Sequence, residues 1–336
     1  MLRIKAWELR EAVREHRLAP MRLRACGAYR YRREVTLKLG EGGGAWWDGV
    51  IQCRSRTCPP CFLARRYKAA KAIETVVHER EQETRQQSYL ITLTIRHHAG
   101  DPIALVKAIR VAWRTLLQSR AFRSWKEDHG VEWICVEEIT LGENGWHPHL
   151  HTLCMPRTKI DASDLWSLSS IWFEWWRKIV VKKLGAEHEP SRMHGCDLTP
   201  CDSAAYLTKL GMELADPLAV KGSAPLALLA GGRIEEYMEL QRYRSRARDL
   251  TFSRGLSQLR AVLKDLEEPA ESADLIAIRG IDWYTLRALG WAKPLEVCEA
   301  TDPATAVEAM QKILGPSYLP AEIGGVPTFT RDNEKP

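Results

Sequence analysis

The sequence predicts an α+β fold built around an antiparallel sheet, and three observations support this prediction. Residues 88–200 alternate between short β-branched segments and longer amphipathic ones, in the order strand, helix, strand, strand, helix, strand. The second and third strands are joined by the tight polar turn GENG, which is typical of a hairpin. The hydrophobic content of 45% is ordinary for a globular protein with a sizeable core. This order of elements is that of the split βαβ, ferredoxin-like (RRM-like) arrangement, with the helices on one face of the sheet.

The elements before the hairpin follow from composition and from helix-end signals. Alanine, glutamate, lysine and arginine dominate residues 63–87, which favours a long helix. The segment SYLITLTIR (88–96) alternates apolar residues with threonine and predicts a strand. Asp101 followed by Pro102 is typical of an N-cap and a first helical position, so a helix is expected from there to about residue 126.

The hairpin and the elements after it complete the predicted core. Its paired strands are VEWICVEEITL (131–141) and WHPHLHTLCM (146–155). A tryptophan-rich helix is expected to start at Asp161, and a short strand follows over residues 192–200. Asp202 then has the position of an N-cap for a helix that holds AAYLTKLGMEL.

The chain is expected to contain three consecutive parts. Residues 1–87 form a cysteine-rich, zinc-binding region with the long helix, and residues 88–215 form the core just described. Residues 216–336 are predicted to be mostly helical, with a Pro/Gly-rich tail.

Charge gives a first indication of the partner. The net charge is +6, and basic runs lie at residues 22–33, 54–56, 64–71 and 242–248, partly interleaved with aromatic residues. Such runs suit a phosphate backbone, although each one alone is also compatible with a solvated surface. No apolar run approaches about 18 residues, so neither a signal peptide nor a membrane span is expected, and the expected location is the cytoplasm.

Three histidines alternate along the second hairpin strand. His147, His149 and His151 therefore share one face, which favours a metal site over the alternative of merely polar, solvent-facing residues. His147 precedes Pro148 at the start of the strand, and contact with DNA or orientation of a ligand is its alternative role.

The hairpin register decides which carboxylate joins the histidines. If Leu141 pairs with Trp146, Glu138 lies opposite His149 and Glu137 points to the other face. Two imidazoles and one carboxylate suit a divalent cation that keeps open positions for substrate oxygens. A slip of one residue would exchange Glu137 for Glu138.

A tyrosine and a lysine lie near the start of the helix after the last strand. Tyr206 is about one turn into that helix, where a phosphate is favoured, and Lys209 is on the same face. The lysine could neutralise phosphate charge or help to ionise the phenol. The alternative is that Tyr206 is a packing residue.

Four early cysteines have the spacing of a structural zinc site. Two of them form a CxxC knuckle, and four thiolates make a tetrahedral site for Zn²⁺. A redox CxxC motif or free thiols are the alternatives. The four cysteines are Cys26, Cys53, Cys58 and Cys61, and the intervening Arg54 and Arg56 would suit phosphates.

Most of the tryptophans of the tryptophan-rich helix, and two later cysteines, are predicted to pack in the core. Stacking on bases is the alternative for the tryptophans, but a helix that covers a sheet must bury one face. The residues concerned are Trp166, Trp172, Trp175 and Trp176, together with Cys196 and Cys201.

Taken in order, these motifs resemble those of the HUH endonucleases and, among them, the rolling-circle replication initiators of plasmids. His149-Leu150-His151 matches the HUH motif, LITLTIR (90–96) resembles the first motif and Tyr206-Leu207-Thr208-Lys209 the third. CGAY with CRSRTCPPC resembles the cysteine-rich start of many plasmid initiators, and TFSRGLSQL (251–259) resembles a segment after the catalytic part. The resemblance covers roughly residues 20–265.

The resemblance implies a metal-dependent tyrosine endonuclease. Mg²⁺ or Mn²⁺ would be held by His149, His151 and Glu138, with His147 as a further candidate, and Tyr206 would form a 5′-phosphotyrosine link with help from Lys209. The expected substrate is single-stranded or cruciform origin DNA, which Thr92 and Thr94 could contact unless they simply pack. The expected partners are a host polymerase and helicase, and a homo-oligomer is compatible.

One departure concerns termination. Some relatives carry a second tyrosine or a glutamate four residues from the nucleophile, but here those positions are Leu210 and Asp202. Glu213 lies on the same helical face as Tyr206 and is a candidate for activating a water.

Three other interpretations stay open at this point. A transposase or a mobilisation relaxase would share the chemistry, and a non-catalytic zinc-ribbon protein would bind DNA without cutting it. A metal-dependent oxidoreductase would need a barrel of many short strands, which the long predicted helices contradict.

Overall fold

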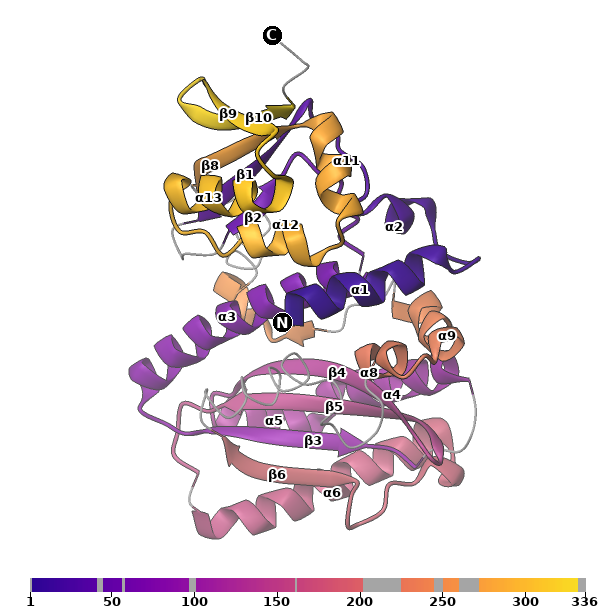
Figure 1. Cartoon of the computed structure of the whole chain (residues 1–336). Helices are drawn as coiled ribbons and strands as arrows, with labels where there is room; N and C mark the ends of the chain where they lie inside the picture. Colours follow the sequence, from indigo (N-terminus) through magenta and orange to yellow (C-terminus); the bar gives the residue numbers. More distant parts are fainter. Residues whose placement is uncertain are drawn as a thin grey trace. The chain divides into compact units, whose positions relative to one another are not determined.

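The computed structural model divides the chain into two compact units (Figure 1). Unit 1 joins the two ends of the sequence, Met1–Leu63 and Leu266–Pro336, and unit 2 is the continuous segment Ala64–Asp265. The residues described are 2–40, 45–55, 58–96, 101–160, 162–201, 225–244, 250–259 and 272–331. This division differs from the three consecutive parts that the sequence suggested, because strands near both ends pair in one sheet.

Unit 2 is built on a five-stranded antiparallel sheet. The strand order is β6-β3-β5-β4-β7, and every neighbouring pair is antiparallel. The strands are β3 (Ser88–Thr94), β4 (Glu132–Gly142), β5 (Gly145–Met155), β6 (Cys196–Cys201) and β7 (Leu250–Phe252). The predicted α+β class and the predicted order of strands and helices over residues 88–200 are therefore confirmed.

Four longer helices accompany this sheet: α3 (Pro59–Thr84), α4 (Pro102–Gln118), α5 (Arg120–Asp128) and α6 (Ala162–Leu184). Asp101 caps α4 as predicted, with its Oδ1 2.9 Å from the backbone nitrogen of Ile103. The helix predicted to run to about residue 126 is two helices, because Ser119 is extended and caps α5 through a bond to the backbone N–H of Phe122.

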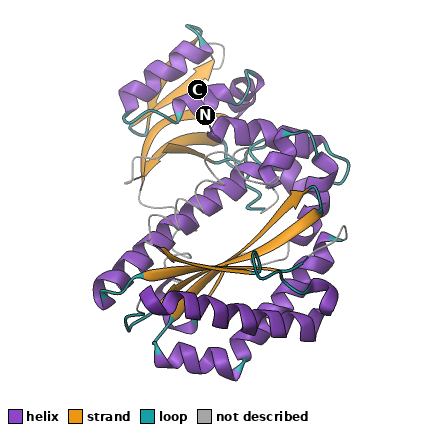
Figure 2. Cartoon of the chain, turned by 90° about the horizontal axis from the view of Figure 1, so that it is seen from below, coloured by secondary structure: helices purple, strands orange, loops and turns teal. Residues whose placement is uncertain are grey.

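Helices α4 and α6 pack against each other, and both pack against the sheet of unit 2 (Figure 2). Trp172 and Trp176 of α6 are fully buried, and Trp172 meets Phe122 edge to face at 5.6 Å. The core role predicted for these two tryptophans is confirmed, as is the burial of Cys196 and Cys201. Trp175 is partly exposed, and the side chain of Trp166 is outside the described residues.

Unit 1 has its own five-stranded sheet, in the order β2-β1-β8-β10-β9. Only the pair β8 and β10 is parallel among the strands described in this sheet. Its strands are β1 (Glu34–Gly40), β2 (Ala45–Asp48), β8 (Ser272–Arg279), β9 (Tyr318–Ile323) and β10 (Val326–Arg331). Its helices are α1 (Leu2–Glu15), α2 (Met21–Ala25), α11 (Gly280–Ala288), α12 (Ala292–Val297) and α13 (Pro303–Leu314).

The prediction of a mostly helical segment over residues 216–336 left out the strands that the structure contains there. Its described part contributes one strand to the sheet of unit 2 and three to that of unit 1. Strands β9 and β10 form a hairpin across Gly324 and Gly325, which both have positive φ, as a two-residue hairpin turn requires.

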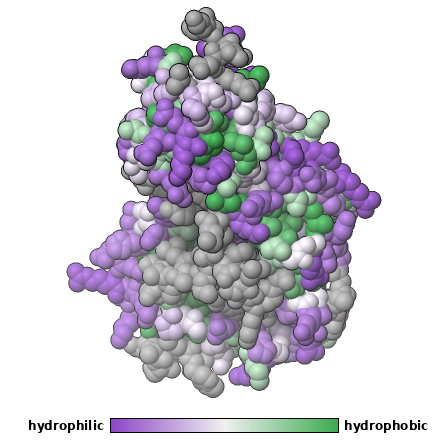
Figure 3. Space-filling model, viewed as in Figure 1, coloured by the Kyte–Doolittle hydropathy of each residue, from purple (hydrophilic) through white to green (hydrophobic). Residues whose placement is uncertain are grey.

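On the face seen in Figure 1, the described residues present mostly hydrophilic side chains, with small hydrophobic patches between them (Figure 3). Among the described helices, none combines the length and the apolar character that crossing a membrane requires.

Candidate active site and metal centre

The register of the β4–β5 hairpin is the one predicted. Leu141 pairs with Trp146, and Glu138 lies directly opposite His149. The alternative register, which would bring Glu137 to the histidines, is therefore excluded. The four-residue turn fixes this pairing because any slip would move every side chain of one strand to the wrong face.

Glu137 is held on the opposite face of the sheet from the histidines. Its carboxylate makes an ion pair with Arg110 of α4, with Nε at short range and Nη2 3.1 Å from Oε1. Glu137 pairs with Leu150, which is buried and points to the same side. Two adjacent glutamates thus have separate environments, one facing a helix and one facing the histidines.

Glu138 and His151 are in direct contact. Oε2 of Glu138 lies 2.8 Å from Nε2 of His151, and these side chains are only 11% and 16% exposed. On its other side, Nδ1 of His151 lies 3.1 Å from Oγ1 of Thr92, the residue paired with it on β3. Thr92 therefore orients the His151 ring, which is the usual task of a second hydrogen bond on a metal-binding imidazole.

The three imidazoles form a parallel row along β5. The ring centroids of His147 and His149 are 5.7 Å apart, those of His149 and His151 are 6.1 Å apart, and neighbouring planes differ by 13° and 16°. Nε2 of His149 lies 3.3 Å from Oγ1 of Thr140 on β4. His149 is thus turned along its own row rather than toward the contact between Glu138 and His151.

The donor set on this face suits a divalent cation. A carboxylate with two imidazoles fits Mn²⁺ or Mg²⁺ with positions left for phosphate oxygens. The structure brings Glu138 and His151 together, and a rotation of the His149 ring would add the third donor. In the described part of the chain, three or more such donor atoms lie within 4.8 Å of one another only at the cysteine cluster.

Thr94 has a structural task at the edge of the histidine face. Its hydroxyl donates to the carbonyl of His194 at 2.8 Å, and its own carbonyl accepts from Nε1 of Trp176 at 2.6 Å. These bonds tie β3 to α6 and to the loop before β6.

The predicted nucleophile lies outside the described residues. The same holds for Lys209, Glu213 and Arg56. The last described residue before Tyr206 is Cys201, which pairs with Ser88 at the end of β3 farther from Thr94. For the segment that leads to Tyr206, the structure therefore gives only the point at which it leaves the sheet.

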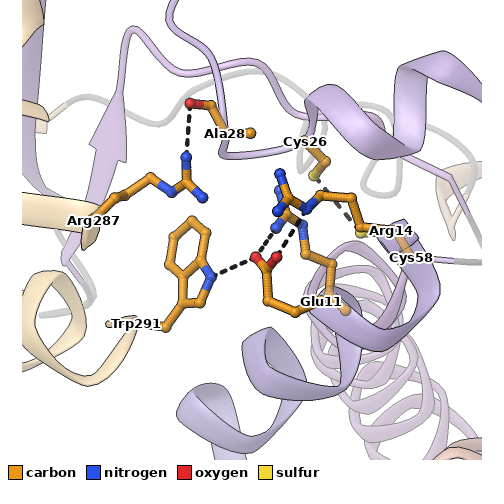
Figure 4. A network of polar contacts seen from close by, with 8 residues as sticks. Glu11, Arg14, Cys26, Ala28, Cys58, Arg287 and Trp291 are labelled. Atoms are coloured by element: carbon orange, nitrogen blue, oxygen red, sulfur yellow. Dashed lines mark hydrogen bonds and ion pairs between the residues drawn. The ribbon is translucent and has the colours of Figure 1, made fainter. Parts of the chain in front are cut away.

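The four early cysteines converge on one point in unit 1. Figure 4 shows two of them, Cys26 and Cys58. Three pairs of sulfur atoms are 3.6 Å apart: Cys26 with Cys61, Cys53 with Cys61, and Cys58 with Cys26. A tetrahedron with Zn–S bonds of about 2.3 Å has edges of about 3.8 Å. The cluster therefore has the size that a structural zinc ion requires.

Backbone N–H groups also point at these sulfurs. The backbone nitrogen of Cys53 lies 3.4 Å from the sulfur of Cys26, and that of Ser55 lies 3.4 Å from the sulfur of Cys53. Arg54 between them has a φ of 49°, which places this turn in the left-handed region. Such N–H···S contacts stabilise thiolates, as expected in a metal knuckle.

The thiols of this cluster cannot all ionise without a cation. Hydrogen bonds from Cys53 and its neighbours lower the pKa of Cys26, whereas the contact with Cys26 raises the pKa of Cys58 and of Cys61. A dication removes this conflict because it stabilises every thiolate at once.

An arginine cluster around the buried Arg10, not predicted from the sequence, lies beside Cys26 and Cys58 (Figure 4). Glu11 binds Arg10, Arg14 and Nε1 of Trp291, the last two at 2.8 Å each. Arg10 is fully buried, and its Nε and Nη2 have no hydrogen-bond partner among the described residues. Burial lowers the pKa of Arg287, and the charges of Arg10 and Arg14 act in the same direction.

Aromatic rings complete this cluster. Trp7 and Trp291 stack at 4.1 Å, and the Arg10 guanidinium lies 5.3 Å from each ring centroid. Trp7, Arg10, Glu11 and Arg14 share one face of α1 at helical spacing, which is a signal present in the sequence. Their partner Trp291 comes from the other end of the chain.

A family of known proteins matches the segment that contains the β5 histidines and most of the early cysteines. The family model described as "Replication protein" matches residues 47–184. The expected resemblance to replication initiators is confirmed. This replication-protein segment includes the β5 histidines, Glu138 and three of the four cysteines, and it ends before Tyr206.

A named relative agrees with the replication-protein match. A protein of Streptomyces lividans described as "Protein rep" is 26% identical over 245 residues, which is 58% of this chain and 53% of that relative. The chain thus aligns with about half the length of the relative. No solved structure matched the chain.

Proposed function

We propose that the chain initiates rolling-circle replication by nicking one DNA strand at an origin. The observation that carries this proposal is the contact of 2.8 Å between Glu138 and His151. It lies on the face of β4 and β5 opposite to Glu137, next to His149, within the replication-protein segment.

The proposed metal ligands are His149, His151 and Glu138, with His147 as a further candidate. A bound Mg²⁺ or Mn²⁺ would polarise a non-bridging oxygen of the scissile phosphate. Thr92 would keep Nε2 of His151 directed at this position through its bond to Nδ1. The parallel row of rings would let His149 turn toward the same point with a change in one side-chain torsion.

The proposed nucleophile is the phenolic oxygen of Tyr206. It attacks phosphorus, the bond from phosphorus to the 3′ oxygen breaks, and a 5′-phosphotyrosine link forms. The phenol loses one proton and the leaving 3′ oxygen gains one, so proton and charge numbers balance. A phenol is mostly protonated at neutral pH, and Lys209 would favour its ionised form and neutralise phosphate charge.

The position of Tyr206 in the sequence allows it to reach the histidine face. Tyr206 follows Cys201 by five positions, a stretch that spans at most about 17 Å when fully extended. Cys201 pairs with Ser88, which is four residues from Thr92, or about 13 Å along β3. Rejoining would reverse the transfer without ATP, and Glu213 is the candidate that activates a water in this one-tyrosine chain.

The proposed role of the cysteine cluster is to hold a structural Zn²⁺ with Cys26, Cys53, Cys58 and Cys61. The tetrathiolate would carry a net charge of about −2. The neighbouring cluster contains three arginines and one glutamate, a net charge of +2. We expect these opposite charges to stabilise each other.

The proposed substrate is single-stranded or cruciform origin DNA, because the nucleophile must reach a splayed strand. The 3′-OH would prime a host polymerase, a helicase would open the template, and the reaction would take place in the cytoplasm.

The test uses a labelled single strand that covers a candidate origin, with Mn²⁺, on a denaturing gel. We expect a covalent protein–DNA band that is lost with EDTA and lost in Tyr206→Phe. Tyr284→Phe is the matched control, because Tyr284 is an exposed tyrosine of α11 in unit 1. Cleavage that survives Tyr206→Phe would contradict the assigned nucleophile.

A non-catalytic zinc-ribbon DNA-binding protein is the second candidate. It is favoured by one observation, the fully assembled cysteine cluster in a chain whose three histidine-face donors do not converge. Tight origin binding without any covalent band would support it. A transposase or relaxase would give the same band and would differ in the strand that is cleaved.

A further inference from the structure

A run of 18 residues before β1 carries strong positive charge. Residues 16–33 contain six arginines and no aspartate or glutamate. Within the described part of the chain, Arg32 alone of these six forms an ion pair, with Oδ2 of Asp48 at 2.7 Å. The six are Arg17, Arg22, Arg24, Arg30, Arg32 and Arg33.

The second half of this run has a fixed backbone. Gly27 donates to the carbonyl of Ile51 at 2.6 Å, Ile51 donates to the carbonyl of Tyr29 at 2.8 Å, and Tyr31 donates to the carbonyl of Gly49 at 2.8 Å. Arg30 forms a β-bridge with Val50. Cys26, directly before Gly27, belongs to the cysteine cluster.

Two tyrosines stand out from this fixed segment. Tyr29 and Tyr31 flank Arg30, whose backbone forms the β-bridge with Val50, so both rings start from the same fixed stretch of chain. They are 54% and 60% exposed, which is unusual for aromatic rings on a structured backbone. The hydroxyl of Tyr31 donates to Oδ1 of Asp48 at 3.0 Å, and the Arg32 guanidinium lies over the ring, 5.5 Å from its centroid, so this ring is held at its edge and already stacks with one of the arginines.

The rings and the charges together define the ligand. Flat exposed rings bind bases by stacking, and arginines beside them bind phosphates. A duplex would satisfy the arginines but would keep its bases stacked inside, away from Tyr29 and Tyr31. The ligand that uses both features is a single strand with unstacked bases.

We propose that Tyr29 and Tyr31, with the surrounding arginines, form a stacking platform for single-stranded DNA in unit 1. The choice of DNA rests on the proposed function, since RNA bases would stack equally well. The platform would be a DNA contact separate in sequence from the histidine strand. The cysteine cluster would hold the backbone of the platform in place.

The test measures binding without cleavage, in the full zinc-loaded chain carrying Tyr206→Phe. Fluorescence anisotropy reports the affinity for a mixed-sequence labelled single strand and for the matching duplex. Removal of each ring should weaken single-strand binding about 5- to 150-fold, so Tyr29→Ala/Tyr31→Ala should lose at least about 25-fold. Tyr29→Phe keeps the ring and should bind normally, as should Met193→Ala, which removes an 82% exposed side chain of unit 2.

Salt dependence separates stacking from charge. Arg22→Gln/Arg33→Gln should lower the slope of log affinity against log salt by about 0.7 for each phosphate that is no longer neutralised. Tyr29→Ala/Tyr31→Ala should leave that slope unchanged. Zinc content and circular dichroism of each variant show that the fold is kept.

Two results would overturn the platform. One is unchanged single-strand binding in Tyr29→Ala/Tyr31→Ala, and the other is a loss confined to the duplex. The assay measures binding alone, so its result is independent of nicking. A chain that never forms a covalent band can still show the platform, and an active nickase can lack it.

Discussion

Nε2 of His151 lies 2.8 Å from Oε2 of Glu138, while the adjacent Glu137 faces the other side of the sheet and binds Arg110. The chain therefore contains two neighbouring carboxylates of the same chemistry with different tasks. This pair allows the metal site and the fold to be tested separately.

We expect Glu138→Gln to abolish Mn²⁺-dependent cleavage while the free energy of unfolding changes by less than about 1.5 kcal/mol. The amide keeps a hydrogen bond to His151 but removes the charge that a cation needs. The gel assay and urea unfolding measure the two quantities.

Glu137→Gln is the matched control. It leaves the Arg110 guanidinium without its carboxylate in a partly buried place, so we expect a loss of about 1–3 kcal/mol in stability with cleavage retained. If Glu137→Gln abolished cleavage in a folded protein and Glu138→Gln did not, the assigned ligand would be wrong.

The cysteine cluster should hold one zinc ion per chain. Metal analysis of the purified protein measures the content, and Cys58→Ser should lose the ion, because the sulfur of Cys58 lies 3.6 Å from that of Cys26 inside the cluster. The melting temperature should fall with it, since binding of the metal contributes to folding.

Cys298→Ala is the comparison for this variant, because Cys298 is a buried cysteine of unit 1 outside the cluster. It should keep the full zinc content. Equal zinc in Cys58→Ser and the wild type would show that the ion is held elsewhere.

Two thiols of unit 2 should make stability depend on alkaline pH. Burial raises the pKa of Cys135 and of Cys196 to about 12. The folded state therefore keeps a proton that the unfolded chain loses near pH 9, and stability should fall as the pH rises from about 9 toward 12. Each thiol contributes a slope of at most about 1.4 kcal/mol per pH unit.

Urea unfolding at several alkaline pH values measures this slope. Cys135→Ala should reduce the slope, whereas Cys61→Ala in the zinc cluster changes metal content instead. A stability that is flat between about pH 9 and pH 11 in the wild type would contradict the prediction.

Glu11 should contribute strongly to the free energy of unfolding of unit 1. Glu11→Gln removes the carboxylate that is bound to the fully buried Arg10 in the described part of the chain, and we expect a loss of about 3–5 kcal/mol. Thermal or urea unfolding measures this loss.

Glu8→Gln provides the reference for a pair at the surface. Glu8 and Lys5 are 56% and 57% exposed and lie 3.4 Å apart, so their separation should cost less than about 1 kcal/mol. Similar losses for Glu8→Gln and Glu11→Gln would show that the arginine cluster is compensated by another group.

The hairpin could be predicted from the sequence because its information is local. The turn GENG and the alternation on both sides set the register, so the pairing of Glu138 with His149 followed without a structure. The break at Ser119 was missed because Ala and Leu around it favour one continuous helix, whereas the extended serine starts a second one.

Contacts between distant parts of the sequence were not predictable in the same way. Strand β7 pairs with β4 more than a hundred residues earlier, and Ser253 then exchanges hydrogen bonds with the backbone of Trp133. Nothing local in TFSRGL specifies that partner. The hairpin of β9 and β10 carried a detectable signal, the two glycines at its turn.

The pairing of β1 with β8 has a consequence for synthesis on the ribosome. Residues 34–40 leave the ribosome more than 230 residues before their partner, residues 272–279. At about 5–20 residues per second, the edge of β1 waits on the order of tens of seconds for β8, while the whole of unit 2 emerges as an uninterrupted stretch. Slow translation or a delayed chaperone would therefore affect the two units unequally. Unit 2 can fold as soon as it has been synthesised, whereas β1 of unit 1 keeps an unpaired edge until β8 has been synthesised.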